Sequence, residues 1–349
     1  MRILLTGGAG FIGSALTREL LSRGHDVRVL DLLTYAGVAA SLVELEGDSA
    51  YSFVRGDIAD PVVVADVFAD FKPEAVAHLA AETHVDRSID GPAVFVRTNI
   101  VGTQVLLDQA FATWRDLSGE AREAFRFLHV STDEVFGSLG DEGRFSETSP
   151  YDPRSPYAAS KAASDHLVRA WSHSFGLPTM ISNCSNNYGA RQFPEKLIPT
   201  MVLRALRGET LPVYGDGANV RDWLFVDDHA RALADILERG TPGRTYAVGG
   251  DAERTNLQLV RALCGVLDRV RPAMDGRPHA ERIVMVEDRP GHDQRYAIDH
   301  SFITSELGWR PRVALEEGLE QTVRWYLDNP EWWTPLIADG DSLARRGVL

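Results

Sequence analysis

Cysteine is scarce in this sequence, with two residues, Cys184 and Cys264, among 349. Two thiols so far apart exclude the disulfide framework of a small secreted protein and a cysteine-rich zinc site, so both are expected to be buried apolar side chains. No apolar run approaches the roughly 18 residues that a membrane span needs, and the opening Met1 to Thr6 is too short for a secretory signal. We therefore expect a cytoplasmic protein without a membrane-spanning segment.

An excess of positive charge is also absent. The formal net charge is -14, from 36 Lys and Arg against 50 Asp and Glu. Such a chain has no long-range attraction for nucleic acids or anionic membranes, so neither is expected as a partner, and an anionic ligand must be held by a few local cations. The ten histidines show no metal-ligand spacing, and no metal site is expected.

Short apolar runs alternate with longer amphipathic segments through the first half of the chain. Strands are predicted at 3–6, 27–30, 51–55, 75–79, 127–131 and 179–183. Helices are predicted at 11–22, 62–71, 94–114 and 157–175. This alternation predicts an α/β fold with a Rossmann-type, doubly wound parallel sheet. The pattern fades after residue 183, which predicts a dinucleotide-binding domain over 1–183, with a later contribution from about 220–250, and a smaller C-terminal substrate-binding lobe over 184–349.

Three glycines, Gly7, Gly10 and Gly13, follow the first predicted strand and open the first predicted helix. A glycine turn lets the backbone approach a pyrophosphate, which then lies against the positive end of the helix dipole. Asp31, at the end of the second strand, stands where a carboxylate hydrogen-bonds the adenosine ribose and repels a 2'-phosphate. The pattern favours NAD over NADP, although a tight turn without a ligand has the same local sequence. Asp57 and Ile58 after the third strand are a plausible adenine contact.

Tyr157 and Lys161 are four residues apart on a predicted helix and therefore share one face. A neighbouring ammonium favours the phenolate, which predicts a lowered pKa for Tyr157 and a base that works at neutral pH. The spacing alone also occurs on ordinary surface helices. After a dinucleotide-binding loop, it is typical of short-chain dehydrogenase chemistry.

The segment Ser131-Thr132-Asp133-Glu134 places a hydroxyl and two carboxylates at the end of a buried strand. Alcohol oxidation or epimerisation needs only a hydroxyl with the tyrosine and lysine. The two acids suit an elimination, in which a base removes a proton from one carbon and an acid protonates the hydroxyl leaving the next. An acidic turn at a helix N-terminus is the structural alternative.

Several motifs from both halves of the chain resemble one family. They are Ser131-Thr-Asp-Glu-Val135, Ala80-Ala-Glu-Thr-His-Val-Asp-Arg-Ser88, Asn183-Cys-Ser-Asn-Asn-Tyr-Gly189, Phe193-Pro-Glu-Lys-Leu-Ile-Pro199, Asn219-Val-Arg-Asp-Trp223 and Asp288-Arg-Pro-Gly-His292. Over roughly residues 3 to 330 the chain resembles the dTDP-glucose 4,6-dehydratases, which are extended short-chain dehydrogenase/reductases.

The resemblance implies an NAD-dependent hydro-lyase that makes dTDP-4-keto-6-deoxyglucose and water. Tyr157, assisted by Thr132 and Lys161, takes the O4 proton as C4 is oxidised. Glu134 then removes the C5 proton while Asp133 protonates the C6 hydroxyl. The hydride returns to C6, so NAD is regenerated each turnover and is expected to stay tightly bound.

The resemblance also implies the binding residues. The cofactor set beyond the three glycines is Phe11, Ile12, Asp31, Leu32, Leu33, Thr34, Asp57, Ile58, Leu79, Ala80, Ala81, Thr98, Tyr157, Lys161 and Asn187. The nucleotide-sugar set is Thr83, Thr132, Asn186, Lys196, Leu197, Pro212, Val213, Tyr214, Arg221, Asn256, Asp288, Arg289, Pro290, Gly291 and His292. Lys196, Arg221 and Arg289 are cations suited to a diphosphate.

Three positions depart from the family pattern: Thr83 stands where serine is usual, Phe136 replaces tyrosine, and Ala190-Arg191 replaces Pro-Tyr. A nucleotide-sugar 4-epimerase, a UDP-glucuronate decarboxylase, an inverting amino-sugar dehydratase and a non-catalytic NAD-binding protein are disfavoured by the complete Thr-Asp-Glu set. UDP-glucose 4,6-dehydratase is the harder alternative. The resemblance also implies a homodimer, to which the apolar faces of helices 94–114 and 157–175 could contribute, although such faces pack equally well on their own sheet.

Overall fold

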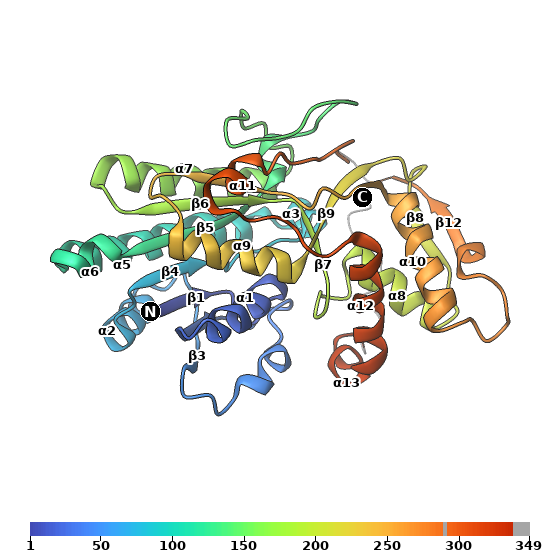
Figure 1. Ribbon diagram of the computed structural model, residues 1–349, viewed down its shortest axis with the longest axis horizontal. Helices are drawn as coiled ribbons and strands as arrows, with labels where there is room; N and C mark the ends of the chain where they lie inside the picture. The colour runs from blue at the N-terminus through green and yellow to red at the C-terminus, as the bar shows by residue number, and fades with distance from the viewer. Residues whose placement is uncertain (289–291, 338–349) are drawn as a thin grey trace.

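The computed structural model describes residues 1–288 and 292–337 and contains a seven-stranded parallel sheet in the order β10-β6-β5-β4-β1-β2-β3 (Figure 1). Its strands are β1 (Arg2–Thr6), β2 (Asp26–Asp31), β3 (Tyr51–Arg55), β4 (Ala75–His78), β5 (Arg126–Thr132), β6 (Thr179–Cys184) and β10 (Thr245–Val248). The chain builds the sheet outward from β1 in one direction through β2 and β3, and then in the other direction from β4. This reversal between β1 and β4 places a crevice at the carboxyl ends of these two strands.

Helices cover both faces of this sheet. One face packs on α1 (Phe11–Ser22), α9 (Val226–Arg239) and α11 (Ser301–Leu307). The other packs on α2 (Pro61–Phe71), α5 (Thr103–Asp116) and α7 (Pro156–Phe175). Successive residues of β1 serve the two cores: Ile3 and Leu5 belong to the first, and Leu4 to the second. The predicted doubly wound α/β fold is confirmed.

Local sequence explains why the helix ends match the prediction closely. Helix α2 begins at Pro61, and the Asp60 side chain accepts a hydrogen bond from the Val62 amide. Helix α7 begins at Pro156, where the Ser155 side chain caps the Ala158 amide, and it ends before Gly176, which has φ +74°. These signals are local, so they can be read without the tertiary structure.

The prediction of a helix over 94–114 is confirmed, but part of this helix is π-helical rather than α-helical. The segment consists of α4 (Pro92–Phe95), a π-helical stretch η3 (Val96–Gly102) and α5. Within the π stretch, the buried Asn99 amide exchanges two hydrogen bonds with the Glu82 backbone and donates another to Ser160 Oγ at 2.8 Å. These partners come from distant segments and stabilise the widened turn. Two short helices, α3 (Val85–Asp90) and α6 (Gly119–Ala124), were not predicted.

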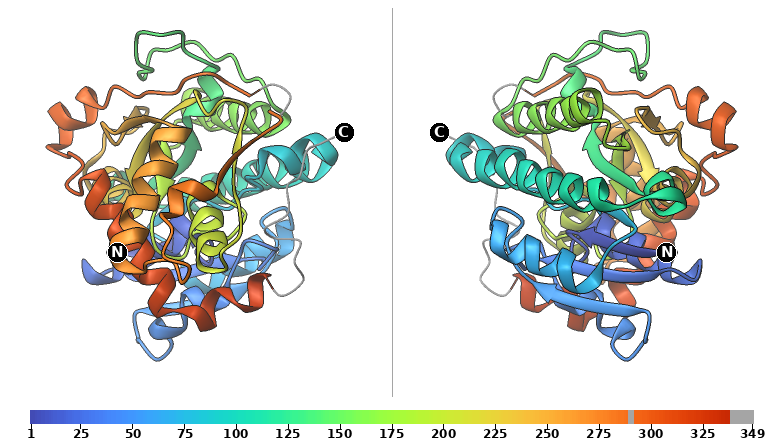
Figure 2. Two further views of the ribbon diagram at one scale, coloured as in Figure 1. Left: turned by 90° about the vertical axis from the view of Figure 1, so that its right-hand side faces the viewer. Right: turned by 90° about the vertical axis from the view of Figure 1, so that its left-hand side faces the viewer.

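The second region has its own hydrophobic core and two small sheets, with strand orders β11-β9-β7 and β12-β8. Its strands are β7 (Asn186–Tyr188), β8 (Leu211–Tyr214), β9 (Val220–Phe225), β11 (Glu253–Thr255) and β12 (Ile283–Val286). Its helices are α8 (Leu197–Leu206), α10 (Asn256–Val270), α12 (Leu315–Asp328) and α13 (Pro330–Trp333), which lie to the right in Figure 1 and toward the viewer in the left panel of Figure 2. We refer to this region as the lobe.

Short 3-10 turns connect the larger elements. They are η1 (Ala39–Ser41), η2 (Val43–Leu45), η4 (Asp133–Phe136), η5 (His279–Arg282) and η6 (Pro335–Ile337). Turn η4 follows β5 directly and brings its side chains to the carboxyl edge of the sheet.

Candidate active site

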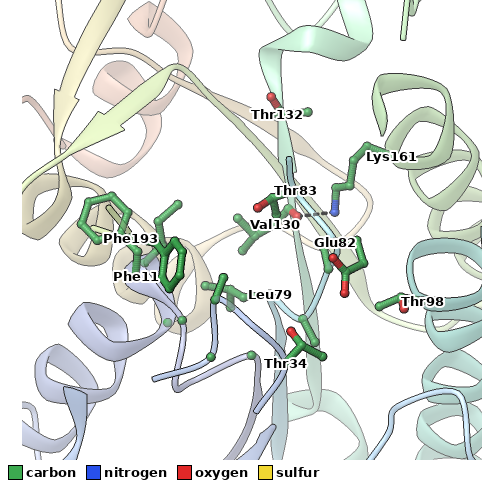
Figure 3. A pocket seen from close by; sticks show the side chains of 18 of the residues that line it. Phe11, Thr34, Leu79, Glu82, Thr83, Thr98, Val130, Thr132, Lys161 and Phe193 are labelled. Atoms are coloured by element: carbon green, nitrogen blue, oxygen red, sulfur yellow. Dashed lines mark hydrogen bonds between the residues drawn. The ribbon is translucent and has the colours of Figure 1, made fainter. Parts of the chain in front are cut away.

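A cavity of about 320 Å³ lies at the carboxyl ends of the central strands and is lined by residues of both the sheet region and the lobe (Figure 3). All five expected catalytic residues line it. So do all the expected cofactor residues except Leu33, together with four of the expected substrate residues, Thr83, Thr132, Asn186 and Lys196. Residues far apart in the sequence thus converge on one site.

The glycine loop is shaped for close approach. Gly7 has φ +75°, and a Cβ there would lie 2.6 Å from the Ala80 amide nitrogen. A Cβ on Gly13 would lie 2.1 Å from the Gly7 carbonyl oxygen. Helix α1 begins directly after this loop, and its N-cap residue supplies no side-chain hydrogen bond. The loop and the helix N-terminus therefore fit the pyrophosphate of a dinucleotide.

Asp31 is held at the end of β2 by two backbone amides. Its two carboxylate oxygens accept hydrogen bonds from Ala9 N at 2.9 Å and Leu33 N at 2.8 Å. Burial raises the pKa of the Asp31 carboxyl, and these two amides oppose the rise. Leu33 has φ +55° and does not line the cavity, whereas Leu32 and Thr34 on either side of it do. The carboxylate at this position fits the ribose of NAD.

Lys161 lies one helical turn from Tyr157, as predicted, and both side chains are buried. The Lys161 ammonium donates to the Val130 carbonyl oxygen at 2.8 Å, the dashed line in Figure 3, and burial lowers its pKa to about 8. The prediction of a lowered pKa for Tyr157 is wrong. Burial and the Glu134 carboxylate raise the pKa of its phenol. Hydrogen bonding to Thr132 opposes that rise.

The acid pair follows β5. The Thr132 hydroxyl accepts from the Glu134 amide at 3.2 Å, which begins turn η4. Asp133 is 2 % exposed, and its one recorded hydrogen bond is a long one of 3.3 Å from the Thr132 hydroxyl. Its Oδ2 has no hydrogen-bond partner among the residues the structure describes. Burial, then the Glu134 charge, raises the pKa of Asp133 well above its usual value, which fits a proton donor at neutral pH.

The lobe contributes cations to the site. Lys196 Nζ is 3.4 Å from the Thr83 carbonyl oxygen at the cavity wall. Arg221 is 5 % exposed, lies 4.3 Å from the centre of the Tyr296 ring, and opposes the rise in the Asp133 pKa. The charge of Glu134 contributes to raising the pKa of the Tyr296 phenol. The lobe therefore reaches the acid pair.

Most of the remaining expected site residues lie outside the cavity wall. Asn187 does line the cavity, and its side-chain oxygen accepts from His229 Nδ1 at 2.9 Å. Eight expected substrate residues belong to the lobe without lining the cavity: Leu197, Pro212, Val213, Tyr214, Arg221, Asn256, Asp288 and His292. His292 accompanies Asp288, with 2.7 Å between Nδ1 and Oδ1. Arg289, Pro290 and Gly291 lie outside the described residues.

Sequence reasoning assigned no role to several residues of the wall. They are Leu30, Ala36, Gly37, Gly56, Glu82, Val130, Cys184, Ser185, Gln192, Phe193 and Glu195. Glu195 is the most informative of these, because it accepts from the Tyr35 hydroxyl at 3.1 Å and lies 3.6 Å from the Arg87 guanidinium. This contact joins the loop after β2, helix α3 and the lobe. The sequence signal that could have indicated Glu195 is its place next to Lys196 in the Phe-Pro-Glu-Lys segment, because Lys196 was itself an expected site residue.

Two kinds of feature are missing from residues 1–288 and 292–337. These residues contain no helix long and apolar enough to span a membrane. The same residues hold no cluster of three or more histidine, cysteine, aspartate or glutamate side chains able to bind a metal ion.

Known proteins resemble the whole chain. The family model described as GDP-mannose 4,6 dehydratase matches residues 4–322. A dTDP-glucose 4,6-dehydratase of Xanthomonas campestris pv. campestris (strain B100) is 54% identical over 345 residues, which cover 99% of this chain and 98% of that protein.

The fold is shared with solved structures of two activities. The dTDP-glucose 4,6-dehydratase from Streptomyces venezuelae, with NAD and TYD bound, is 47% identical with a TM-score of 0.86 and covers 96% of this chain and 100% of its own. A UDP-glucose 4-epimerase of Thermus thermophilus, in complex with NAD, is 30% identical with a TM-score of 0.82. The match covers 94% of this chain and 99% of that chain. The fold alone therefore does not choose between the two activities, whereas the sequence identity favours the first. This chain belongs to the dTDP-glucose 4,6-dehydratase family, within the broader group that the GDP-mannose 4,6 dehydratase model describes.

Proposed function

We propose that this chain converts dTDP-glucose into dTDP-4-keto-6-deoxyglucose and water, with NAD as a retained cofactor. The observation that carries the proposal is the acid pair Asp133 and Glu134, which shares one cavity with Tyr157 and Lys161. Epimerisation at C4 has no use for an acid and a base on neighbouring carbons, whereas elimination of water needs both.

The first part of the reaction uses the tyrosine, the lysine and the threonine. When bound, NAD+ supplies the hydride acceptor for C4 and the later hydride donor for C6, and its positive charge in this buried cavity favours the Tyr157 phenolate. Tyr157 takes the O4 proton, and the Thr132 hydroxyl hydrogen-bonds O4. The Lys161 ammonium stabilises the phenolate because it lies one turn away on the same helix.

The second part uses the two carboxyl groups. A ketone at C4 makes the C5 proton acidic, and Glu134 removes it. Asp133 delivers its proton to the C6 hydroxyl, which leaves as water. Glu134 later returns to C5 the proton that it removed, which completes the proton balance at that carbon. The buried Asp133, whose Oδ2 has no hydrogen-bond partner among the described residues, supports this assignment, because a neutral carboxyl group can donate there.

The nucleotide is proposed to bind between the cavity and the lobe. Lys196 and Arg221 are the described cations suited to its diphosphate. The division into a cofactor domain of residues 1–183, with a contribution from about 220–250, and a substrate lobe is proposed on the same basis. The cytoplasm stays the predicted location.

We further propose that two copies of the chain associate through the helical segment 92–116 and α7. Exposed apolar side chains occur on this segment, at Val94, Val96 and Val101, with Ile89 just before it and Phe175 at the end of α7. Sedimentation velocity on the purified protein tests this proposal. A monomer at micromolar concentration would contradict it, and a dimer that dissociates in a Val94→Asp, Val101→Asp variant would support it.

The decisive experiment is incubation of the purified protein with dTDP-glucose and, separately, UDP-glucose, without added NAD. Loss of water is followed by mass spectrometry. Dehydration of dTDP-glucose alone is expected, and equal turnover of UDP-glucose would overturn the base preference while leaving the chemistry standing. If NAD is bound and neither sugar is dehydrated, the roles of Asp133 and Glu134 fail. Asp141→Asn, on an exposed loop, is the control for Asp133→Asn.

A further inference from the structure

Asp165 is a carboxylate in the protein interior that the proposed reaction does not use. It lies on α7 one turn beyond Lys161 and is 0 % exposed. Its Oδ2 accepts hydrogen bonds from three uncharged donors: the Ser131 hydroxyl at 2.9 Å, the Tyr151 hydroxyl at 2.7 Å and the Asn183 amide at 3.3 Å. An ionised aspartate this deep is costly unless such donors surround it, so the donors indicate that it carries a charge.

His129, on β5, lies between this carboxylate and the catalytic lysine. Its Nε2 is 3.2 Å from Asp165 Oδ1 and 3.4 Å from Lys161 Nζ. Its Nδ1 has no hydrogen-bond partner among the described residues, and burial lowers the ring pKa to about 4. The ring is therefore neutral at neutral pH, and its Nε2 is close to both charged groups. It separates the two charged groups without cancelling either.

The other titratable groups around Lys161 carry no charge that could replace that of Asp165. Cys184 on β6 has its pKa raised by burial, and His78 on β4 has its pKa lowered by burial, so both are neutral. Tyr157, on the same helix, has a raised pKa, and Glu134 acts on that phenol from turn η4. Burial lowers the pKa of Lys161, and the Asp165 carboxylate is the main opposing group.

We propose that Asp165 is a positioning residue whose buried charge, set behind β5 and screened by neutral His129, keeps Lys161 in its ammonium form over the working pH range. Only the catalytic consequence rests on the proposed function. The effect on the titration of Lys161 holds whatever the substrate is. Without the carboxylate, burial acts on Lys161 alone, and the ammonium is lost at a lower pH.

The chain is well suited to a direct measurement because it has three lysines, Lys72, Lys161 and Lys196. Protein labelled with ¹³C at the lysine ε-carbon gives few signals, and Lys161→Met identifies the one that matters. In the NAD-bound protein, the midpoint of this signal is expected to be at least about one unit lower in Asp165→Asn than in the wild type. An unchanged midpoint in Asp165→Asn would overturn the proposal.

Two further variants separate charge from packing. Asp165→Glu keeps the charge and is expected to restore the wild-type midpoint. Asp108→Asn makes the same chemical change at an exposed position of α5, where the carboxylate accepts a hydrogen bond from Gln104, and is expected to leave the midpoint in place. A shift of equal size in Asp108→Asn would point to a general effect of charge or packing and would overturn the specific role.

Activity supplies the second readout. In Asp165→Asn the alkaline limb of the kcat profile should move to lower pH by the same amount as the NMR midpoint, with activity partly recovered in acid. A uniform loss at every pH would mean that the residue is only structural. Because the NMR titration needs no substrate, failure of the proposed function leaves it interpretable.

A double variant covers the case in which Asp165→Asn alone does not fold. Removing both members of a buried charge pair costs less than removing one. On a Lys161→Met background, Asp165→Asn should lower the residual kcat by less than about threefold, since the residue acts through Lys161. A loss as large as in an otherwise wild-type background, or any loss above about tenfold, would contradict the proposal.

Discussion

Two buried aspartates lie close to β5, and their pKa values shift in opposite directions. Asp133 is in the turn after the strand and lines the cavity, whereas Asp165 is on α7 in the protein interior. Asp133, facing the cavity, is 2 % exposed, and burial raises its pKa. Asp165, behind the strand, is 0 % exposed, yet its pKa is lowered: burial would raise it, but His129 and the surrounding hydrogen bonds outweigh that effect. Burial is nearly equal, so the neighbouring charges and hydrogen-bond donors decide the charge: Glu134 raises the pKa of Asp133, whereas Lys161 helps to lower that of Asp165. One long hydrogen bond leaves Asp133 a neutral acid, whereas three donors hold Asp165 as an anion.

The largest expected effect is on catalysis at the neutral aspartate. Asp133→Asn keeps the shape of the side chain but cannot release a proton, so the kcat for dehydration of dTDP-glucose should fall by about 10²–10⁴-fold. Bound NAD should remain, because Asp133 is not among the residues expected to hold it. Quantifying the dehydrated sugar and the released nucleotide cofactor checks both. Activity within threefold of wild type would remove Asp133 from the mechanism.

The next effect is on stability, and its sign should differ between the two sites. Asp133 takes up a proton on folding at neutral pH, so stability falls as pH rises above the unfolded pKa of about 3.9, by up to about 1.4 kcal/mol per pH unit. Asp133→Asn removes this cost and should raise the melting temperature at pH 7, with a smaller gain at pH 5. Thermal melts of NAD-loaded protein at both pH values test this trade-off of stability for function. A gain that does not depend on pH would contradict the linkage.

Asp165→Asn should do the reverse. Its depressed folded pKa contributes stability that is present above the unfolded pKa and is lost as pH falls through the folded value. The substitution should therefore cost about 1–3 kcal/mol at pH 7, because hydrogen bonds to a charged acceptor are replaced by weaker ones. The same thermal melts, at pH 7 and in acid, measure it. If the two asparagine variants shift stability in the same direction, the comparison between the sites fails.

The smallest expected effect removes a single donor. Tyr151→Phe deletes the 2.7 Å hydrogen bond to Asp165 while three other polar neighbours remain. A loss of about 1–2 kcal/mol is expected, with the Asp133 side of the strand unaffected, so kcat for dehydration should stay within about threefold. Urea unfolding measures the first quantity and steady-state kinetics the second.

Much of the site could be predicted because its signals are local. The three glycines open α1, Tyr157 and Lys161 are one helical turn apart, and the acid pair directly follows β5. Proline and side-chain caps marked the helix starts, so α2 and α7 were predicted to within one residue. These features depend on neighbours within a few positions, which a sequence shows directly.

Other features could not be predicted because their partners are distant in the sequence. The π-helical turn is stabilised by Glu82 and Ser160, and the Glu195 contact needs Tyr35, which is 160 residues away. The direction of the Tyr157 pKa was predicted from Lys161 alone and proved wrong, because burial and Glu134 also act on the phenol.

The sequence by itself determined the first six strands of the parallel sheet and the main helices between them, the dinucleotide-binding loop and the set of reactive side chains, since each follows from short-range pattern and turn chemistry. Only the tertiary structure decided which of these side chains carry charge. A carboxyl group's pKa depends on how much water it loses and on donors from other segments. Asp133 and Asp165 are both ordinary acids in the sequence, and folding makes one a proton donor and the other a permanent anion.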